Sequence, residues 1–90
     1  MDENESIEFK ENYTEKIYKE IIAFLNTNSG TIYIGYDDNG NLIGVDNCKD
    51  IEEKISNGIR TNIYPDARIF VSINTGKIED KEYIIIKVSK

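Results

Sequence analysis

Side chains that could take part in chemistry are concentrated near the start of the chain. The segment ENESIEFK, from Glu3 to Lys10, places three carboxylates and a lysine around a short apolar alternation. Carboxylates supply the hard oxygen ligands that Mg²⁺ or Mn²⁺ prefers, and a metal held in this way can assist chemistry on a phosphate group. We therefore expect any chemistry of this chain in this segment.

Cysteine and histidine usage narrows the possible chemistry. The chain has no histidine and a single cysteine, Cys48. Histidine acid–base catalysis, a disulfide within the chain and a zinc site of the Cys/His type are therefore excluded. Cys48 lies near the start of a predicted helix, where a lowered pKa is one interpretation and simple packing is the other.

The charge balance opposes nucleic-acid binding unless the charges are unevenly distributed. The chain carries 17 acidic and 11 basic residues, for a net charge of -6. Averaged over the surface, this charge repels a phosphate backbone, so a nucleic-acid surface would need basic residues gathered on one face, or positive charge from a cation, a dimer partner or a further segment. The basic residues we would test for phosphate contact are Lys16, Lys19, Arg60 and Arg68. For each of them the alternative is a solvated surface position.

The first half of the chain predicts a strand, a helix and a hairpin. Ser6 to Lys10 alternates apolar and polar residues with the period of a strand, and a helical stripe then begins at Thr14, a potential N-cap. The helix should end within Asn26–Ser29, with Gly30 in the left-handed conformation. A hairpin follows, with arms at Thr31–Tyr36 and Asn41–Val45.

Strict alternation along the first arm of this hairpin would put Tyr33 and Tyr36 on opposite faces of the sheet. At most one of them could then stack on a base, while the other would fill the core.

The second half predicts one more helix and two more strands. Asp46 or Asn47 can cap the helix, whose isoleucines recur every four residues until Tyr64–Pro65 ends it. The strands are expected at Ala67–Asn74 and Glu82–Val88, with Thr75–Lys77 and Glu79–Asp80 in their connection. The element order is therefore β-α-β-β-α-β-β, an α+β fold with one mixed sheet and two helices.

Length and composition predict one small domain inside the cell. Ninety residues support a single core. No apolar run approaches the ~20 residues of a membrane helix, and the N-terminus is acidic, so we expect a cytoplasmic protein. Because the last predicted strand reaches almost to Lys90, we also expect a domain taken from a longer protein.

The two densest segments resemble the Schlafen-type, Alba-like domain found at the N-terminus of many bacterial transcriptional regulators and in Schlafen proteins. In that family an acidic residue precedes Glu-Phe-Lys, and a helix then leads into the pattern AFxNTxGGxxxxGxxDxGxxxG. The matching positions are Glu3, Glu8-Phe9-Lys10, Ala23-Phe24, Asn26-Thr27, Gly30, Gly35, Asp38, Gly40 and Gly44. Ser29 replaces the first glycine of the pair, and the usual last strand with its arginine is missing after Lys90.

The resemblance implies a nucleic-acid-binding module of a regulator, with DNA favoured over RNA and a homodimer expected. In Schlafen proteins three carboxylates cut RNA with a divalent metal, and the corresponding residues here are Glu3, Glu8 and Asp38, with Lys10 contacting phosphate. The simpler alternative places Glu8 and Lys10 on an exposed strand face and gives Asp38 only a turn position. A third alternative is a dimerisation domain whose DNA-binding partner domain lies elsewhere in the protein.

Overall fold

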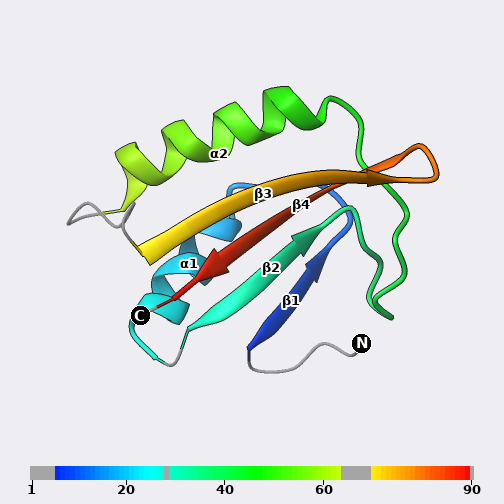
Figure 1. Ribbon diagram of the computed structural model, residues 1–90. Coiled ribbons are helices and arrows are strands. Elements are labelled where there is room, and N and C mark those ends of the chain that lie inside the picture. Colours follow the sequence, from blue (N-terminus) through cyan, green and yellow to red (C-terminus); the bar gives the residue numbers. More distant parts are fainter. Residues whose placement is uncertain (1–5, 28, 64–69, 90) are drawn as a thin grey trace.

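The strands form a single mixed sheet in the computed structural model, which describes residues 6–27, 29–63 and 70–89 (Figure 1). The elements are β1 (Ile7–Lys10), α1 (Ile17–Leu25), β2 (Gly30–Ile34), α2 (Cys48–Asn62), β3 (Val71–Ile78) and β4 (Lys81–Val88). The spatial order is β1-β2-β4-β3, with β1 parallel to β2 and β4 antiparallel to both of its neighbours. The predicted α+β class, with one mixed sheet and two helices, is confirmed.

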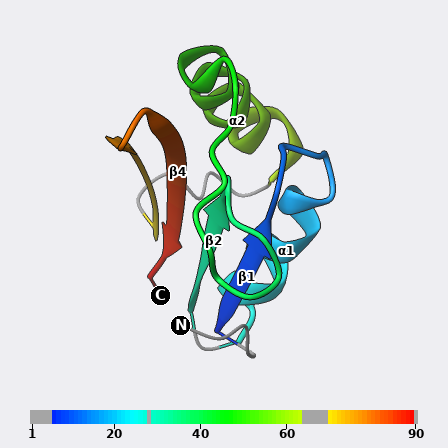
Figure 2. The same ribbon diagram turned by 90° about the vertical axis from the view of Figure 1, so that its right-hand side faces the viewer.

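Both helices pack on the same side of the sheet (Figure 2). The strand side chains that point toward them are almost entirely aliphatic, because successive residues of a strand face opposite sides and only alternate positions reach the helices. The fully buried strand residues of this layer are Ile32, Ile34, Ile84 and Ile86, each with 0% of its surface exposed. The core therefore lies between the sheet and the helix pair.

Helix α1 presents the expected apolar stripe, but its ends differ from the prediction. Thr14 is not the N-cap: the helix begins at Ile17, Lys16 occupies the cap position, and no side chain caps it. Thr14 contributes only its carbonyl, which accepts a hydrogen bond from the Ile17 N–H at 3.2 Å. At the other end Asn26 is the C-cap, as predicted.

The residue after α1 with left-handed backbone is Ser29, with φ of 77°, and not Gly30. Gly30 is instead the first residue of β2, and a Cβ at this position would collide with the ring of Phe24. The glycine is therefore needed so that β2 can approach α1 closely.

The returning arm of the predicted hairpin, Asn41–Val45, is reduced to one antiparallel bridge between Tyr36 and Leu42. The cause lies at Gly35, whose φ of 99° turns the chain away from the line of β2. Its carbonyl accepts hydrogen bonds from the N–H groups of both Ile43 and Gly44, at 2.7 and 2.9 Å, instead of continuing a regular ladder.

Helix α2 follows Asn47, which has left-handed backbone with φ of 57°. Ile55 and Ile59 are buried as the four-residue spacing predicted. Gly58 has a packing role in this helix, because a Cβ at this position would collide with the hydroxyl of Tyr18 in α1. That hydroxyl donates a hydrogen bond to the Lys54 carbonyl at 3.2 Å and so ties the two helices together.

Strands β3 and β4 form a hairpin with a tight turn at Glu79 and Asp80, both at positive φ. The prediction that Thr75–Lys77 belongs to the connection is wrong, because these residues pair with β4 as far as Ile78. The predicted strand start at Ala67 and the helix stop at Tyr64–Pro65 lie outside the described residues. Within the described ranges, neither helix has the length and apolar character needed to cross a lipid bilayer.

Candidate nucleic-acid interface

The side of the sheet opposite the helices forms a second surface, which we call the open face. Its strand residues alternate with the buried ones and, by the strand registers, share one side of the sheet. They are Ile7, Phe9, Thr31, Tyr33, Ser72, Asn74, Gly76, Ile78, Lys81, Tyr83, Ile85 and Lys87. No element that the structure describes packs over this face as the helices pack over the other (Figure 2).

Aromatic rings gather on the open face in a cluster of Phe9, Tyr33, Tyr36 and Tyr83, which we call the tyrosine cluster. Ring centroids lie 5.6 Å apart for Phe9 and Tyr33 and 5.3 Å apart for Tyr33 and Tyr36. Tyr36 and Tyr83 are separated by 6.3 Å in an edge-to-face arrangement. Phe9 is only 4% exposed, whereas the three tyrosines remain half-buried.

The prediction that Tyr33 and Tyr36 lie on opposite faces is wrong. Strict alternation would separate residues three positions apart, but Gly35 interrupts the strand with its positive φ. A Cβ at Gly35 would also approach Val45 Cγ1 to 2.8 Å. The position therefore requires glycine both for its backbone angle and because no space is left for a side chain. The interruption returns Tyr36 to the side of Tyr33.

Tyr83 owes its orientation to Gly76 on the neighbouring strand. These two residues are cross-strand partners, and a Cβ on Gly76 would collide with the end of the Tyr83 ring. The missing side chain therefore lets the ring lie across β3. A ring placed in this way can present one of its faces to solvent.

The phenol of Tyr36 is held in its neutral form. Burial raises its pKa above the ordinary value, and the neighbouring phenols of Tyr83 and Tyr33 act in the same direction. Tyr36 therefore adds no negative charge to the open face near neutral pH.

The predicted phosphate contact Lys10 lies on the helix side of the sheet. Its ammonium forms an ion pair with the carboxylate of Glu20 in α1, with Nζ and Oε2 2.9 Å apart. The other carboxylate oxygen of Glu20, Oε1, is buried and has no hydrogen-bond partner among the described residues. The positive charge of Lys10 is therefore largely neutralised within the fold.

Lys16 and Lys19, two further predicted phosphate contacts, are brought together by the structure. Both are exposed and line one hollow of about 430 Å³ next to the C-terminal end of α2. The hollow is completed by Glu15, Tyr18, Ile22 and Asn62. Within the described residues neither lysine forms an ion pair, but the carboxylate of Glu15 shares the hollow.

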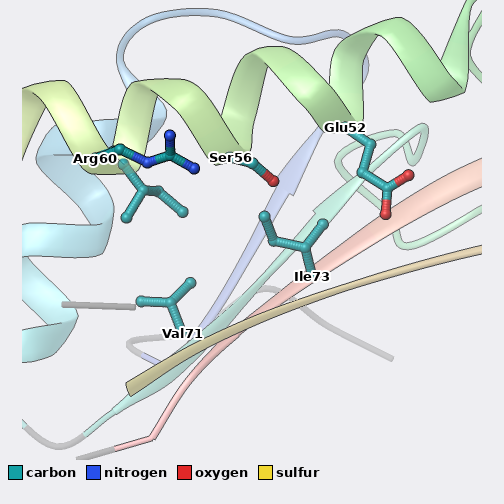
Figure 3. A pocket seen from close by; sticks show the side chains of 6 residues that line it. Glu52, Ser56, Arg60, Val71 and Ile73 are labelled. Carbon is teal, nitrogen blue, oxygen red and sulfur yellow. The ribbon is translucent and has the colours of Figure 1, made fainter. Parts of the chain in front are cut away.

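Arg60 lines a different groove, which lies between α2 and β3 (Figure 3). The groove has a volume of about 340 Å³ and a floor formed partly by Val71 and Ile73. Glu52, Ser56 and Arg60 follow one another at four-residue spacing along the helix, so an acidic and a basic group border the same groove. The predicted basic residues in the described part thus do not form one patch, and Arg68 lies outside it.

The predicted carboxylate set remains a prediction. Glu8 is half-buried in β1 and Asp38 is exposed in the turn after β2, whereas Glu3 lies outside the described residues. Among the residues described, no three His, Cys, Asp or Glu side chains are placed to hold a metal ion.

Comparison of the sequence with protein families identifies its family. A family model described as Schlafen, AlbA_2 matches residues 3–90. The chain belongs to this family. No curated protein and no solved structure matched it. Membership of the Schlafen, AlbA_2 family suggests a nucleic-acid-binding domain.

One departure from the Schlafen, AlbA_2 pattern has a visible consequence. Ser29 stands where the family pattern has a glycine, and it adopts a φ of 77° that glycine adopts without strain. The serine thus adopts a left-handed backbone conformation at a cost that a glycine would not carry.

Asp37 is the turn residue that the sequence analysis overlooked in favour of Asp38. Its carboxylate accepts hydrogen bonds from the N–H groups of Asn39 and Asn41, both at 2.9 Å, and from the Asn41 side-chain amide at 3.2 Å. These bonds, led by that from the Asn41 N–H, lower its pKa. The sequence contained a signal for this role, because an aspartate at the first position of a turn such as Asp-Asp-Asn-Gly commonly accepts hydrogen bonds from the backbone of the turn.

Cys48 packs inside the fold. Its thiol is buried and donates to the Tyr83 carbonyl at 3.6 Å. Burial is the main cause that raises its pKa, and the carboxylates of Glu82 and Glu52 add to the effect. The packing interpretation is therefore supported over that of a lowered pKa.

Proposed function

We propose that this domain binds nucleic acid, DNA in preference to RNA, as a module of a cytoplasmic transcriptional regulator. Family membership supports nucleic-acid binding in general terms. The observation that carries the proposal for this chain is the distribution of charge between the two sides of the sheet.

The open face combines positive charge with an absence of carboxylates. Its described strand positions include Lys81 and Lys87, both exposed, and no aspartate or glutamate, although the whole chain has a net charge of -6. Lys81 donates to the Leu42 carbonyl at 3.4 Å and shares a hollow with Asp46, Asp80 and Glu82, whereas Lys87 forms no ion pair with any described residue. Salt screens exposed charges beyond ~10 Å, so acidic groups farther than this from Lys87 have limited influence on it.

The basic residues on the helix side are proposed as secondary phosphate contacts. Lys16 and Lys19 share their hollow with Glu15, and Arg60 shares its groove with Glu52. Because a carboxylate accompanies each of them, we expect weaker phosphate binding there than at Lys87.

A binding assay over a range of salt concentrations tests the proposal. Fluorescence anisotropy with labelled DNA should show an affinity that falls steeply as salt rises, because phosphate contacts release counterions. Lys87→Glu should weaken binding more than the double variant Lys16→Glu/Lys19→Glu. Lys49→Glu, an exposed charge reversal at the start of α2 outside all proposed contacts, is the matched control and should weaken binding less than either variant.

The absence of binding to both DNA and RNA at low salt would refute the proposed function. Stronger binding of RNA than of DNA would retain nucleic-acid binding but overturn the preference for DNA.

The free edge of β3 supports a homodimer as a further part of this proposal. β3 pairs with β4 on one side, and no described strand pairs with its other edge. Alternate residues of this eight-residue strand direct their backbone N–H and C=O groups to the free edge, where they can pair with another strand. Light scattering should then show a dimer without nucleic acid, and a monomer across the whole concentration range would contradict this proposal.

A further inference from the structure

We propose that the open face is a stacking platform for single-stranded DNA, in which the rings of the tyrosine cluster take bases and Lys87 takes a phosphate. This inference rests on the proposed function, that the domain binds nucleic acid. It adds the form of the nucleic acid and the surface that recognises it.

The rings are placed for stacking rather than for filling a core. The buried core cluster of the fold excludes Tyr33, Tyr36 and Tyr83, which remain half-exposed on the opposite side of the sheet. Phe9 lies beneath them, 5.6 Å from Tyr33 and 6.1 Å from Tyr36. A buried ring that supports partly exposed rings limits their movement, so less entropy is lost when a base stacks on them.

Lysine and tyrosine are combined on one strand. Tyr83, Ile85 and Lys87 occupy alternate positions of β4 on the open face, so the Cα atoms of Tyr83 and Lys87 lie roughly 13 Å apart at 3.3 Å per residue. β4 is an inner strand of the sheet, and Lys87 lies between Thr31 and Ser72 on its two neighbours. A backbone that crosses the face can therefore bring a phosphate to Lys87 while its bases contact the rings.

The shape of the surface favours a single strand over a duplex. A protein reads duplex DNA mainly by inserting a helix or a two-stranded ribbon into a groove. The open face is instead one side of a four-stranded sheet, on which the short polar residues Ser72 and Asn74 lie opposite Lys87 and Ile85. Bases inside a duplex already stack on one another, whereas those of a single strand are free to stack on aromatic side chains.

The composition of the open face favours a nucleic-acid strand over a second protein as its ligand. Tyrosine is common at protein interfaces, but lysine is depleted at their buried centres. Here Lys87 is exposed on an inner strand, and the polar residues Ser72 and Asn74 lie beside β4. A nucleic-acid strand uses the same lysine as a phosphate contact.

Intrinsic fluorescence gives a direct test, because the chain contains six tyrosines and no tryptophan. Titration with an unlabelled oligothymidine should quench tyrosine emission, and anisotropy should show tighter binding of the single strand than of a duplex of equal length. Tyr83→Leu and Tyr33→Leu should each weaken single-strand binding roughly 5- to 150-fold, the range expected for loss of one stacked base. Tyr83→Phe keeps the ring and should stay within a few-fold of wild type, as a matched control.

Lys87→Gln provides a second test that does not disturb packing, since the side chain is exposed. It should weaken binding and lower the slope of log affinity against log salt concentration by the amount expected for about one phosphate contact. Lys49→Gln should change neither quantity. Thermal unfolding of every variant verifies that the fold is retained.

The possible failures can be told apart. If no nucleic acid binds, the proposed function itself is wrong. If nucleic acid binds but folded Tyr83→Leu and Lys87→Gln match wild type, the platform is refuted while the proposed function stands. Equal or tighter binding of duplex refutes the single-strand assignment, and tighter binding of single-stranded RNA refutes the assignment to DNA. A dimer that Tyr83→Leu abolishes without changing DNA affinity would assign the face to a second copy.

Discussion

The two faces of the sheet are made by the same strands and yet carry different side chains. Toward the helices β4 presents Ile84 and Ile86, both fully buried, and toward the open side it presents Tyr83, Ile85 and Lys87. The side of the sheet that the helices cover, here called the covered face, removes aliphatic surface from water and so stabilises the fold. The open face keeps half-exposed rings and positive charge, which add less stability and suit contact with a ligand. The difference teaches that stability and recognition can be divided between alternate residues of one strand.

Neighbouring residues of β4 provide the sharpest test of this division. Ile86→Ala should lower the free energy of unfolding by about 2–5 kcal/mol, because it opens a cavity between the sheet and the helices. Ile85→Ala, one residue away on the open face, should cost about 1 kcal/mol or less, because part of its side chain already contacts water. Urea denaturation of both variants measures the difference. Equal losses would mean that the open face is as deeply packed as the covered one.

The covered face could be predicted from the sequence, whereas the arrangement of the open face could not. The apolar stripe of the first helix and the strand expected at Glu82–Val88 are local patterns, and the structure buries Ile17 and Ile21 in the first and Ile84 and Ile86 in the second. Tyr36 was misplaced because its position depends on the backbone angle of Gly35, and glycine permits this angle without requiring it.

Contacts between residues distant in the sequence could not be predicted from local patterns either. The ion pair between Lys10 and Glu20 joins a strand to a helix, so periodicity within either segment cannot reveal it. The strand order, with β4 inserted between β2 and β3, depends likewise on contacts between distant segments. For the candidate site, the family pattern identified Asp38, but it is the neighbouring Asp37 whose hydrogen bonds organise the turn, and the family pattern does not include that residue.

The turn beside the open face allows a comparison of two adjacent carboxylates. Asp37→Ala should destabilise the protein more than Asp38→Ala at pH 7, because only Asp37 accepts the three turn hydrogen bonds. The folded-state pKa of Asp37 lies below its ordinary value of 3.8, so its stabilising effect is present above that pH and is lost as the pH falls through the lowered pKa. Urea denaturation at pH 7 and again at strongly acidic pH should therefore show a gap between the variants that closes in acid. An equal response at pH 7 would mean that these hydrogen bonds do not hold the turn.

Alkaline titration compares one tyrosine from each face and should give the smallest effect. Burial raises the pKa of Tyr36 on the open face and, more strongly, that of Tyr18 between the helices. The folded state thus keeps protons that the unfolded chain releases above the ordinary value of 10.0, so stability should fall as the pH rises past that value. Absorbance of tyrosinate measures the order of ionisation, and Tyr36 is expected to ionise before Tyr18, whose pKa is raised more strongly. Tyr36→Phe should remove the earlier of these two steps and leave the Tyr18 step in place. If instead Tyr36 ionised at its ordinary pKa, the cluster would be more solvated than the ring distances indicate, and the open face would lose the preformed platform that distinguishes it from an ordinary exposed sheet.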